Sequence, residues 1–176
     1  MIEIKSQNLH RRWLLPIGLI LAGIAGADSR HTVQIGERLG SAQMRGLNGP
    51  SRSLASFLGK PLIINVWASW CEPCRAEMKS FDRLAWLPIG SQVNIIGIST
   101  DDSVDAARAW LAQSNATISQ FIDAQLELET MLGASTLPLT VLVAPDGSVL
   151  RKVRGAQQWD SPLALELLRR TFALPP

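Results

Sequence analysis

An apolar run at residues 61–67 (PLIINVW) ends four residues before two cysteines, Cys71 and Cys74. A short continuous apolar run of this kind predicts a strand buried on both faces. Apolar residues then recur at helical spacing: Ala76, Met78, Phe81, Leu84 and Ala85. The pattern therefore predicts a strand, a turn and a helix, with Cys71 at the helix N-terminus. Free backbone N–H groups and the helix dipole stabilise a thiolate at that position.

The number of cysteines limits what this pair can do. There are no others, and a disulfide between residues three apart closes almost no loop, so a disulfide-stapled scaffold is excluded. A structural zinc site needs four nitrogen or sulfur ligands, whereas the only histidines, His10 and His31, lie near the N-terminus. Pro73 suits the first helical turn, where a missing N–H costs nothing. The Cys-x-x-Cys spacing in this context favours a redox-active dithiol over half a metal site or two unrelated buried thiols.

The rest of the chain alternates strand and helix patterns. Strands are predicted at residues 43–47, 93–99, 139–144 and 148–154, and helices at 52–58, 103–112, 124–132 and 161–172. Pro145-Asp146-Gly147 predicts a hairpin turn between the last two strands. From residue 61 onward the order is β-α-β-α-α-β-β-α, which predicts an α/β sandwich with a mixed central sheet.

The N-terminal 27 residues are typical of an export segment. Lys5, Arg11 and Arg12 precede an uncharged apolar stretch at residues 13–27, which ends in Ala-Gly-Ala. Two outcomes stay open: a signal peptide cleaved near Ala27, or an uncleaved signal anchor. The stretch is short of the ~20 residues that cross a bilayer. We expect residues 28–39 to be a flexible linker and residues 40–176 to be the folded domain.

The charge distribution argues against nucleic-acid binding. The formal net charge is +2, and residues 1–27 account for that surplus. The remaining chain is neutral, whereas binding to nucleic acid requires many cations against the phosphates. No membrane contact is expected beyond the N-terminal segment.

The segment WASWCEPC, from Trp67 to Cys74, resembles the active-site segment of the thioredoxin superfamily. Asn65 and the run CEPCRAE resemble its exported TlpA/ResA/DsbE branch, as do Thr136-Leu137-Pro138 and the segment GAQQWDSP at residues 155–162. The resemblance covers the chain from about residue 40 and implies a thioredoxin-like α/β/α sandwich, a periplasmic location and thiol–disulfide oxidoreductase activity.

The resemblance also implies roles for individual residues. Cys71 would be the attacking nucleophile, and Cys74 would resolve the mixed disulfide. Pro138 would be cis and face the disulfide, while Leu137 would offer its backbone groups to a substrate strand. Glu77, three residues after the second cysteine, would exchange a proton with a cysteine, because partial burial raises the pKa of a carboxyl group. An acid that only complements the helix dipole is the alternative.

Two further residues bear on substrate and direction. Trp70, next to Cys71, is expected to cover the disulfide and to join the docking surface. Glu72 places a negative charge beside Cys71, which disfavours the thiolate and makes the couple less oxidising. We therefore expect a reductant of protein disulfides that needs no bound cofactor or metal.

By the same resemblance, electrons would arrive from a membrane thiol carrier, and substrates would include the haem-site cysteines of apocytochrome c or other periplasmic thiols. Two alternatives remain. A peroxiredoxin-type thiol peroxidase would place Pro and Thr where this chain has Ile64 and Ala68. A copper-binding thiol chaperone would use a distant His, and no His follows His31.

Overall fold

The centre of the fold is β3 (Leu62–Trp67), whose six residues are all buried. The computed structural model describes residues 31–175. β3 pairs in parallel with β4 (Asn94–Ser99) on one side and antiparallel with β6 (Leu139–Val143) on the other. A strand in this position is covered by helices on both faces, which explains why its sequence is apolar except for Asn65.

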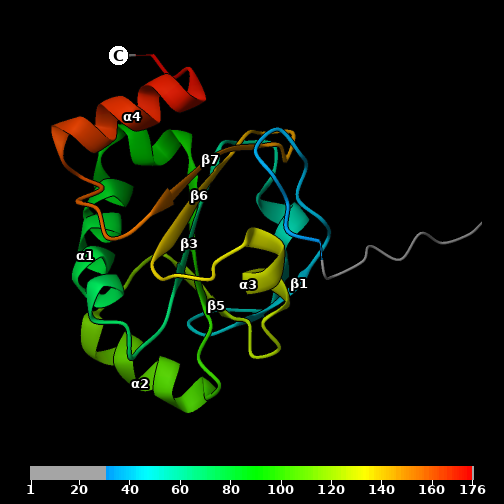
Figure 1. The fold of residues 1–176 in the computed structure, drawn as a ribbon. Helices are drawn as coiled ribbons and strands as arrows, with labels where there is room; N and C mark the ends of the chain where they lie inside the picture. The colour runs from blue at the N-terminus through cyan, green and yellow to red at the C-terminus, as the bar shows by residue number, and fades with distance from the viewer. Residues whose placement is uncertain (1–30, 176) are drawn as a thin grey trace, which may run out of the picture.

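Four further strands complete a seven-stranded sheet in the order β2-β1-β5-β4-β3-β6-β7 (Figure 1). β5 (Ser119–Ile122) is parallel to β4, whereas the other neighbours pair antiparallel. These are β1 (Gln43–Gly46), β2 (Arg52–Ser53) and β7 (Val149–Arg154). The mixed sheet expected from the sequence is therefore confirmed.

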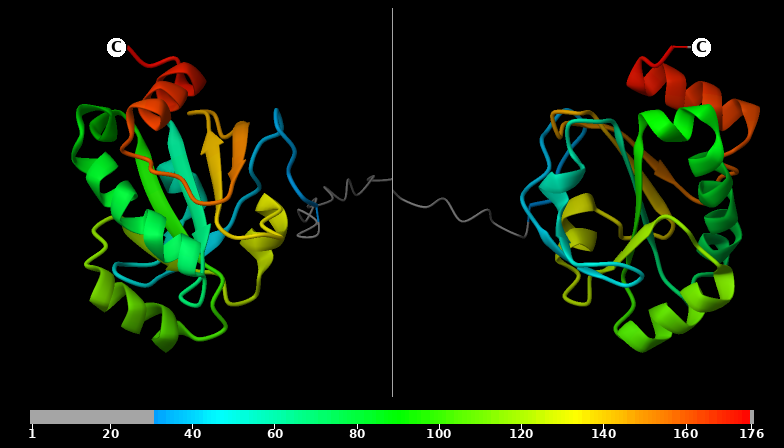
Figure 2. Two further views of the ribbon diagram at one scale, coloured as in Figure 1. Left: turned by 60° about the vertical axis from the view of Figure 1, so that its left-hand side comes forward. Right: turned by 180° about the vertical axis from the view of Figure 1, so that it is seen from behind.

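The helices form a layer on each face of the sheet (Figure 2). α1 (Glu72–Trp86), α2 (Val104–Ser114) and α4 (Pro162–Phe172) contribute to one apolar cluster, with Ile63 and Trp67 of β3. α3 (Glu127–Leu132) and the 3-10 helix η1 (Leu54–Phe57) contribute to the other, with Leu62, Ile64 and Val66. A second 3-10 helix, η2 (Pro88–Gln92), follows α1. Alternate residues of β3 thus bind the two layers together.

Three details differ from the sequence-based expectation. The helix expected at 52–58 is the short strand β2 followed by η1, and α3 begins at Glu127 rather than at residue 124. Leu126 precedes α3 with a left-handed backbone (φ 57°), which delays the helix start. The sequence does not predict β5, because a strand of four residues is too short to show a clear alternation of polar and apolar side chains.

Residues 31–39, part of the segment expected to be a flexible linker, lie against the domain. Val33 is buried and its N–H donates to the Met131 carbonyl, while Arg38 forms a β-bridge with Ser148. Lys152 Nζ donates to the carbonyls of Val33 and Leu132. This part of the chain therefore adds to the domain that we expected to start at residue 40.

The proposed export segment, residues 1–27, lies outside the described residues. Over residues 31–175, no helix combines the length and the apolar character that crossing a bilayer requires.

Candidate active site

The two cysteines lie where β3 gives way to α1. Cys71 is the N-cap residue of α1, and its Sγ accepts a hydrogen bond from the Cys74 N–H at 3.3 Å. Pro73 occupies the first helical turn, as the sequence predicted. Cys71 and Cys74 form a disulfide, with 5.3 Å between their Cα atoms. The site therefore holds its oxidised dithiol at a helix N-terminus, where free N–H groups favour a thiolate after reduction.

The cysteines differ in exposure. Cys71 is 6% exposed and lines a groove of about 530 Å³, whereas Cys74 is fully buried. Trp70, Glu72, Pro73 and Leu137 also line this groove. A partner molecule can therefore approach Cys71 and not Cys74.

Of the three residues predicted to bind substrate, Trp70 and Leu137 line this groove, whereas Pro138 is buried and does not. Trp70 is 71% exposed, so most of its ring faces solvent beside Cys71 rather than covering it completely. The Leu137–Pro138 peptide bond is cis, as the resemblance implied, and it leads into β6. Leu137 lines the groove from just before β6, the strand that pairs with β3, so the groove brings together residues from two distant parts of the sequence.

The groove is acidic. Besides Glu72, its lining residues include Asp102 and Glu129. Burial and the neighbouring Asp123 raise the pKa of Glu129, although a hydrogen bond with Thr100 opposes the shift. The lining residues include no lysine or arginine. These carboxylates disfavour additional negative charge at the mouth of the groove, including a thiolate on Cys71.

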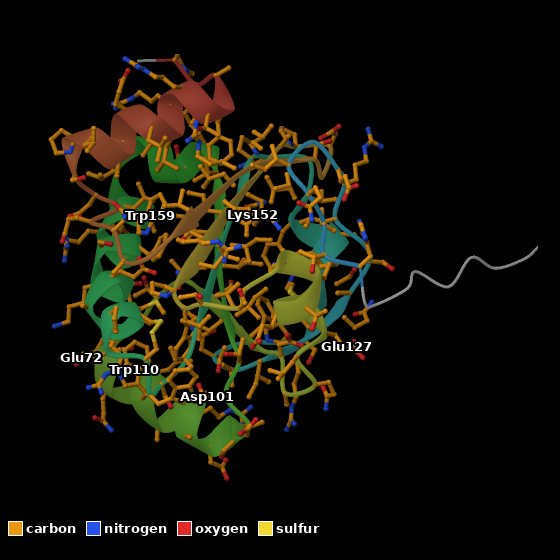
Figure 3. All side chains as sticks on the ribbon, in the orientation of Figure 1. Glu72, Asp101, Trp110, Glu127, Lys152 and Trp159 are labelled. Atoms are coloured by element: carbon orange, nitrogen blue, oxygen red, sulfur yellow. A yellow bond between two sulfur atoms is a disulfide. The ribbon has the colours of Figure 1, made fainter. Side chains whose placement is uncertain are left out.

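A buried carboxylate supports the loop that carries Cys71. Asp101, 3% exposed, accepts hydrogen bonds from the Ser69 N–H at 2.9 Å and from the Ser69 hydroxyl at 2.6 Å. The Ser99 hydroxyl also donates to Asp101, at 2.7 Å. Asp101 therefore ties the loop before Cys71 to the end of β4 and lies at the same end of the molecule as Glu72 (Figure 3).

Glu77 is buried on α1, one helical turn after Cys74. Only 3% of it is exposed, and three groups donate to its carboxylate. Asn65 Nδ2 donates to Oε1 at 2.7 Å. The Gln157 N–H and Trp159 Nε1 donate to Oε2, at 3.0 and 3.2 Å.

Burial raises the pKa of Glu77 to about 7, even though these three hydrogen bonds favour the charged form and oppose the shift. Desolvation is the largest cause, because the carboxylate loses more hydration than its partners replace. A carboxyl group with a pKa near neutrality can take up and release a proton at physiological pH. This geometry favours a proton-exchange role over simple interaction with the helix dipole.

The sequence had not assigned functional roles to Trp159, Gln157 or Asp101. Trp159 is fully buried and lies alongside α1 (Figure 3), with its ring stacked on Phe81 at 5.3 Å between centroids. In the sequence, Gln157 and Trp159 are marked only by the segment GAQQWDSP, which resembles the family but does not assign a role to either residue. The N-cap of α2 is Ser103, whose hydroxyl accepts from the Ala106 N–H, so Asp101 is left to bind the loop before Cys71.

Between residues 31 and 175, no group of three or more His, Cys, Asp or Glu side chains is arranged to hold a metal ion. The reactive groups on which the site can draw are the dithiol and the buried carboxyl group.

Comparison with known proteins places this site in a family. The chain matches the AhpC/TSA family over residues 35–152. It is 28% identical over 160 residues to the thiol-disulfide oxidoreductase ResA of Bacillus cereus, which covers 87% of this chain and 91% of the relative. It is 32% identical over 136 residues to the thiol:disulfide interchange protein DsbE of Pseudomonas aeruginosa, covering 74% and 73%.

A crystal structure from Chlorobium tepidum, described as a thiol:disulfide interchange protein of the DsbE type, has the same fold. Its TM-score is 0.70 at 21% identity, covering 80% of this chain and 96% of that one. At this level of identity the likeness supports the thioredoxin-like fold alone. The family match and the two sequence relatives, taken with the Cys71–Cys74 disulfide, lead to one conclusion: the chain belongs to the AhpC/TSA family and is a thiol–disulfide oxidoreductase of the ResA/DsbE type.

Proposed function

We propose that this oxidoreductase reduces protein disulfides outside the cytoplasm, with Cys71 as the nucleophile and Cys74 as the resolving thiol. The observation that carries the proposal is the asymmetry of the site. Cys71 borders an open groove, whereas Cys74 is buried next to a carboxyl group whose pKa is about 7.

The reaction runs in two exchanges. The Cys71 thiolate attacks one sulfur of a substrate disulfide, forms a mixed disulfide with it and releases the other sulfur as a thiolate that takes a proton from solvent. Cys74 then gives its proton to the Glu77 carboxylate and attacks Cys71 Sγ. The second substrate sulfur leaves as a thiolate that takes a proton from solvent, Glu77 releases the proton that it took from Cys74, and the enzyme ends in the Cys71–Cys74 disulfide form.

Glu77 is proposed to act on Cys74 because the two occupy adjacent turns of α1. A thiol with an ordinary pKa of about 8.5 is mostly protonated at neutral pH, so its attack requires a base. A carboxylate with a pKa of about 7 is a much better match for this thiol than one at 4.5.

Trp70 and Leu137 are proposed to hold the substrate. Both line the groove, and Leu137 precedes the cis proline, so its backbone groups are available at the groove edge. An extended segment of the substrate can pair with such a backbone while its cysteine meets Cys71.

The reducing direction is supported by the charges around Cys71. Glu72, Asp102 and Glu129 line the groove and disfavour a thiolate there. A less stable thiolate lowers the reduction potential of the couple, because a strong oxidant depends on a stabilised reduced form.

Export, and with it the class of partner, is proposed from the first 27 residues. A periplasmic or membrane-anchored enzyme would receive electrons from a membrane thiol carrier. Its substrates would be oxidised thiols of exported proteins, including the haem-site cysteines of apocytochrome c in cytochrome c maturation.

The proposal is tested by the reduction potential of the full chain, equilibrated in dithiothreitol or glutathione buffers and followed by tryptophan fluorescence and by thiol alkylation. The expected value lies at or below that of thioredoxin, about −270 mV. A value near about −120 mV would identify an oxidant and overturn the reducing direction. Cys71→Ser is the control that removes the couple. Consumption of hydrogen peroxide by the reduced chain would favour a thiol peroxidase instead.

A further inference from the structure

The partners of Glu77 are all donors. The Gln157 N–H and Trp159 Nε1–H can only donate a hydrogen bond, and Asn65 presents its Nδ2 to the carboxylate. This arrangement satisfies an ionised Glu77. It leaves no acceptor for the proton of a neutral Glu77, because each oxygen already faces an N–H group.

Asn65 has a side-chain oxygen that can accept a further hydrogen bond. The residue is fully buried in the middle of β3, and its Oδ1 is a buried side-chain oxygen without any hydrogen-bond partner. A buried polar atom without a partner costs about 1–3 kcal/mol and calls for an explanation. Half a turn of the carboxamide about its last side-chain bond exchanges Nδ2 and Oδ1, and then Oδ1 faces Glu77 Oε1.

We propose that Asn65 is a positioning residue whose carboxamide turns over when Glu77 gains its proton, donating to the carboxylate and accepting from the carboxylic acid. The inference rests on the proton-exchange role proposed for Glu77. Of its three partners, Asn65 is the one that can present an acceptor, so the residue determines whether the Glu77 proton has an acceptor; the turn moves Nδ2 to the place where Oδ1 has no partner.

Thr140, on the neighbouring strand β6, is suited to both orientations. Asn65 Nδ2 lies 3.4 Å from Thr140 Oγ1, a long contact in which the hydroxyl accepts. After the turn, Oδ1 occupies this place and the same hydroxyl donates to it, because a hydroxyl can do either. The 3.4 Å contact is longer than an ordinary N–H···O hydrogen bond, so the hydroxyl binds the donating orientation weakly and stabilises the accepting orientation more.

The charges around Glu77 do not compete with this pair. On α1 the titratable neighbour is Cys74, which is free to titrate only after reduction. The segment after β7 contributes Asp160, which pairs with Arg83 of α1, and on α4 Glu166 pairs with Arg170. No charged side chain contributes to the pKa shift of Glu77, whose causes are burial and its three hydrogen bonds.

The test is a pH titration of the Glu77 side-chain carboxyl carbon by NMR in the oxidised full chain, with Glu77→Gln to assign the signal. In the wild type, contacts between the Asn65 amide protons and the Thr140 methyl group should be strong at high pH and lost at the Glu77 midpoint. Thr140→Val removes the hydroxyl that stabilises the accepting orientation. It should lower the midpoint by about 0.7 pH unit, which corresponds to a hydrogen bond of about 1 kcal/mol. Thr140→Ser keeps the hydroxyl and should retain the wild-type midpoint.

The outcomes separate the two proposals. If Glu77 titrates near neutral pH while the Asn65 contacts and the Thr140→Val midpoint do not change, Asn65 is a fixed structural donor and this inference is wrong. In that case the proton-exchange role of Glu77 stands. If Glu77 does not titrate between about pH 5 and 9, both the turnover of Asn65 and the proton-exchange role fail. The reduction potential still tests the direction of the reaction independently.

Discussion

Replacing Glu77 with Gln tests the cost of burying this carboxylate. The pKa of Glu77 rises from 4.5 to about 7 on folding, because burial disfavours the charged form. Between these two values the unfolded chain has lost the proton and the folded chain still holds it. The free energy of unfolding therefore falls as the pH rises through this window, by about 3 kcal/mol in total. The penalty is absent below about pH 4.5 and complete above about pH 7.

The Glu77→Gln side chain is neutral at every pH and imitates the protonated acid. Its carbonyl can accept from the Gln157 N–H and Trp159 Nε1, and its amide can donate to Asn65 Oδ1 once the carboxamide of Asn65, which presents Nδ2 to Glu77, has turned over. The oxidised variant should match the wild type in stability at about pH 4.5 and exceed it by up to about 3 kcal/mol at about pH 8.

Urea unfolding of the oxidised proteins, followed by tryptophan fluorescence at the two pH values, measures this difference. Glu72→Gln is the matched control, since it removes an exposed carboxylate from the first turn of the same helix. Its difference from the wild type should change between the two pH values by less than about 1 kcal/mol, the size of a helix-dipole interaction at an exposed site. If the stability difference between Glu77→Gln and the wild type does not change with pH, Glu77 does not carry a burial penalty and the reasoning is refuted.

Three further predictions follow from the site. Cys74→Ser should accumulate a mixed disulfide between Cys71 and a substrate peptide, detected by non-reducing electrophoresis and mass spectrometry; rapid release of the peptide would contradict the assigned order of attack. Glu72→Gln should raise the reduction potential by about 5 to 20 mV, the effect of removing one exposed charge, and a fall would contradict the argument for a reductant. Asp101→Ala should lower the free energy of unfolding by about 1 to 3 kcal/mol, because it leaves a backbone N–H and two hydroxyls without their acceptor; Asp102→Ala, an exposed neighbour, should have little effect, and equal losses would argue against a supporting role for Asp101.

The sequence predicts those strands and helices whose side chains have the same kind of surroundings along the whole element. Apart from Asn65, the 61–67 run is apolar because β3 is covered on both faces, so its pattern predicts the strand directly. β5 has Ser119 exposed and the polar Gln120 buried, so neither alternation nor an apolar run marks it. Gln120 is buried because it accepts from Trp67 Nε1, and that partner is 53 residues away in the sequence.

The same distinction applies to the site. Cys71 and Cys74 lie three residues apart, so their pairing can be predicted from a short segment of the sequence. Glu77 was predicted through a family resemblance rather than from its own environment. Its partners Asn65 and Trp159 lie 12 and 82 residues away, so only the folded structure brings them to the carboxylate.

The contact of residues 33–39 with β7 also has a consequence for when the site is assembled. A chain that emerges from the ribosome or a translocation channel presents its N-terminus first. Val33 then has no Lys152 to bind, and Arg38 has no Ser148, until almost the whole domain has emerged. The two cysteines need only each other to pair, whereas the groove beside them requires Leu137, which is made much later. The dithiol can thus meet an oxidant before the groove beside it has formed.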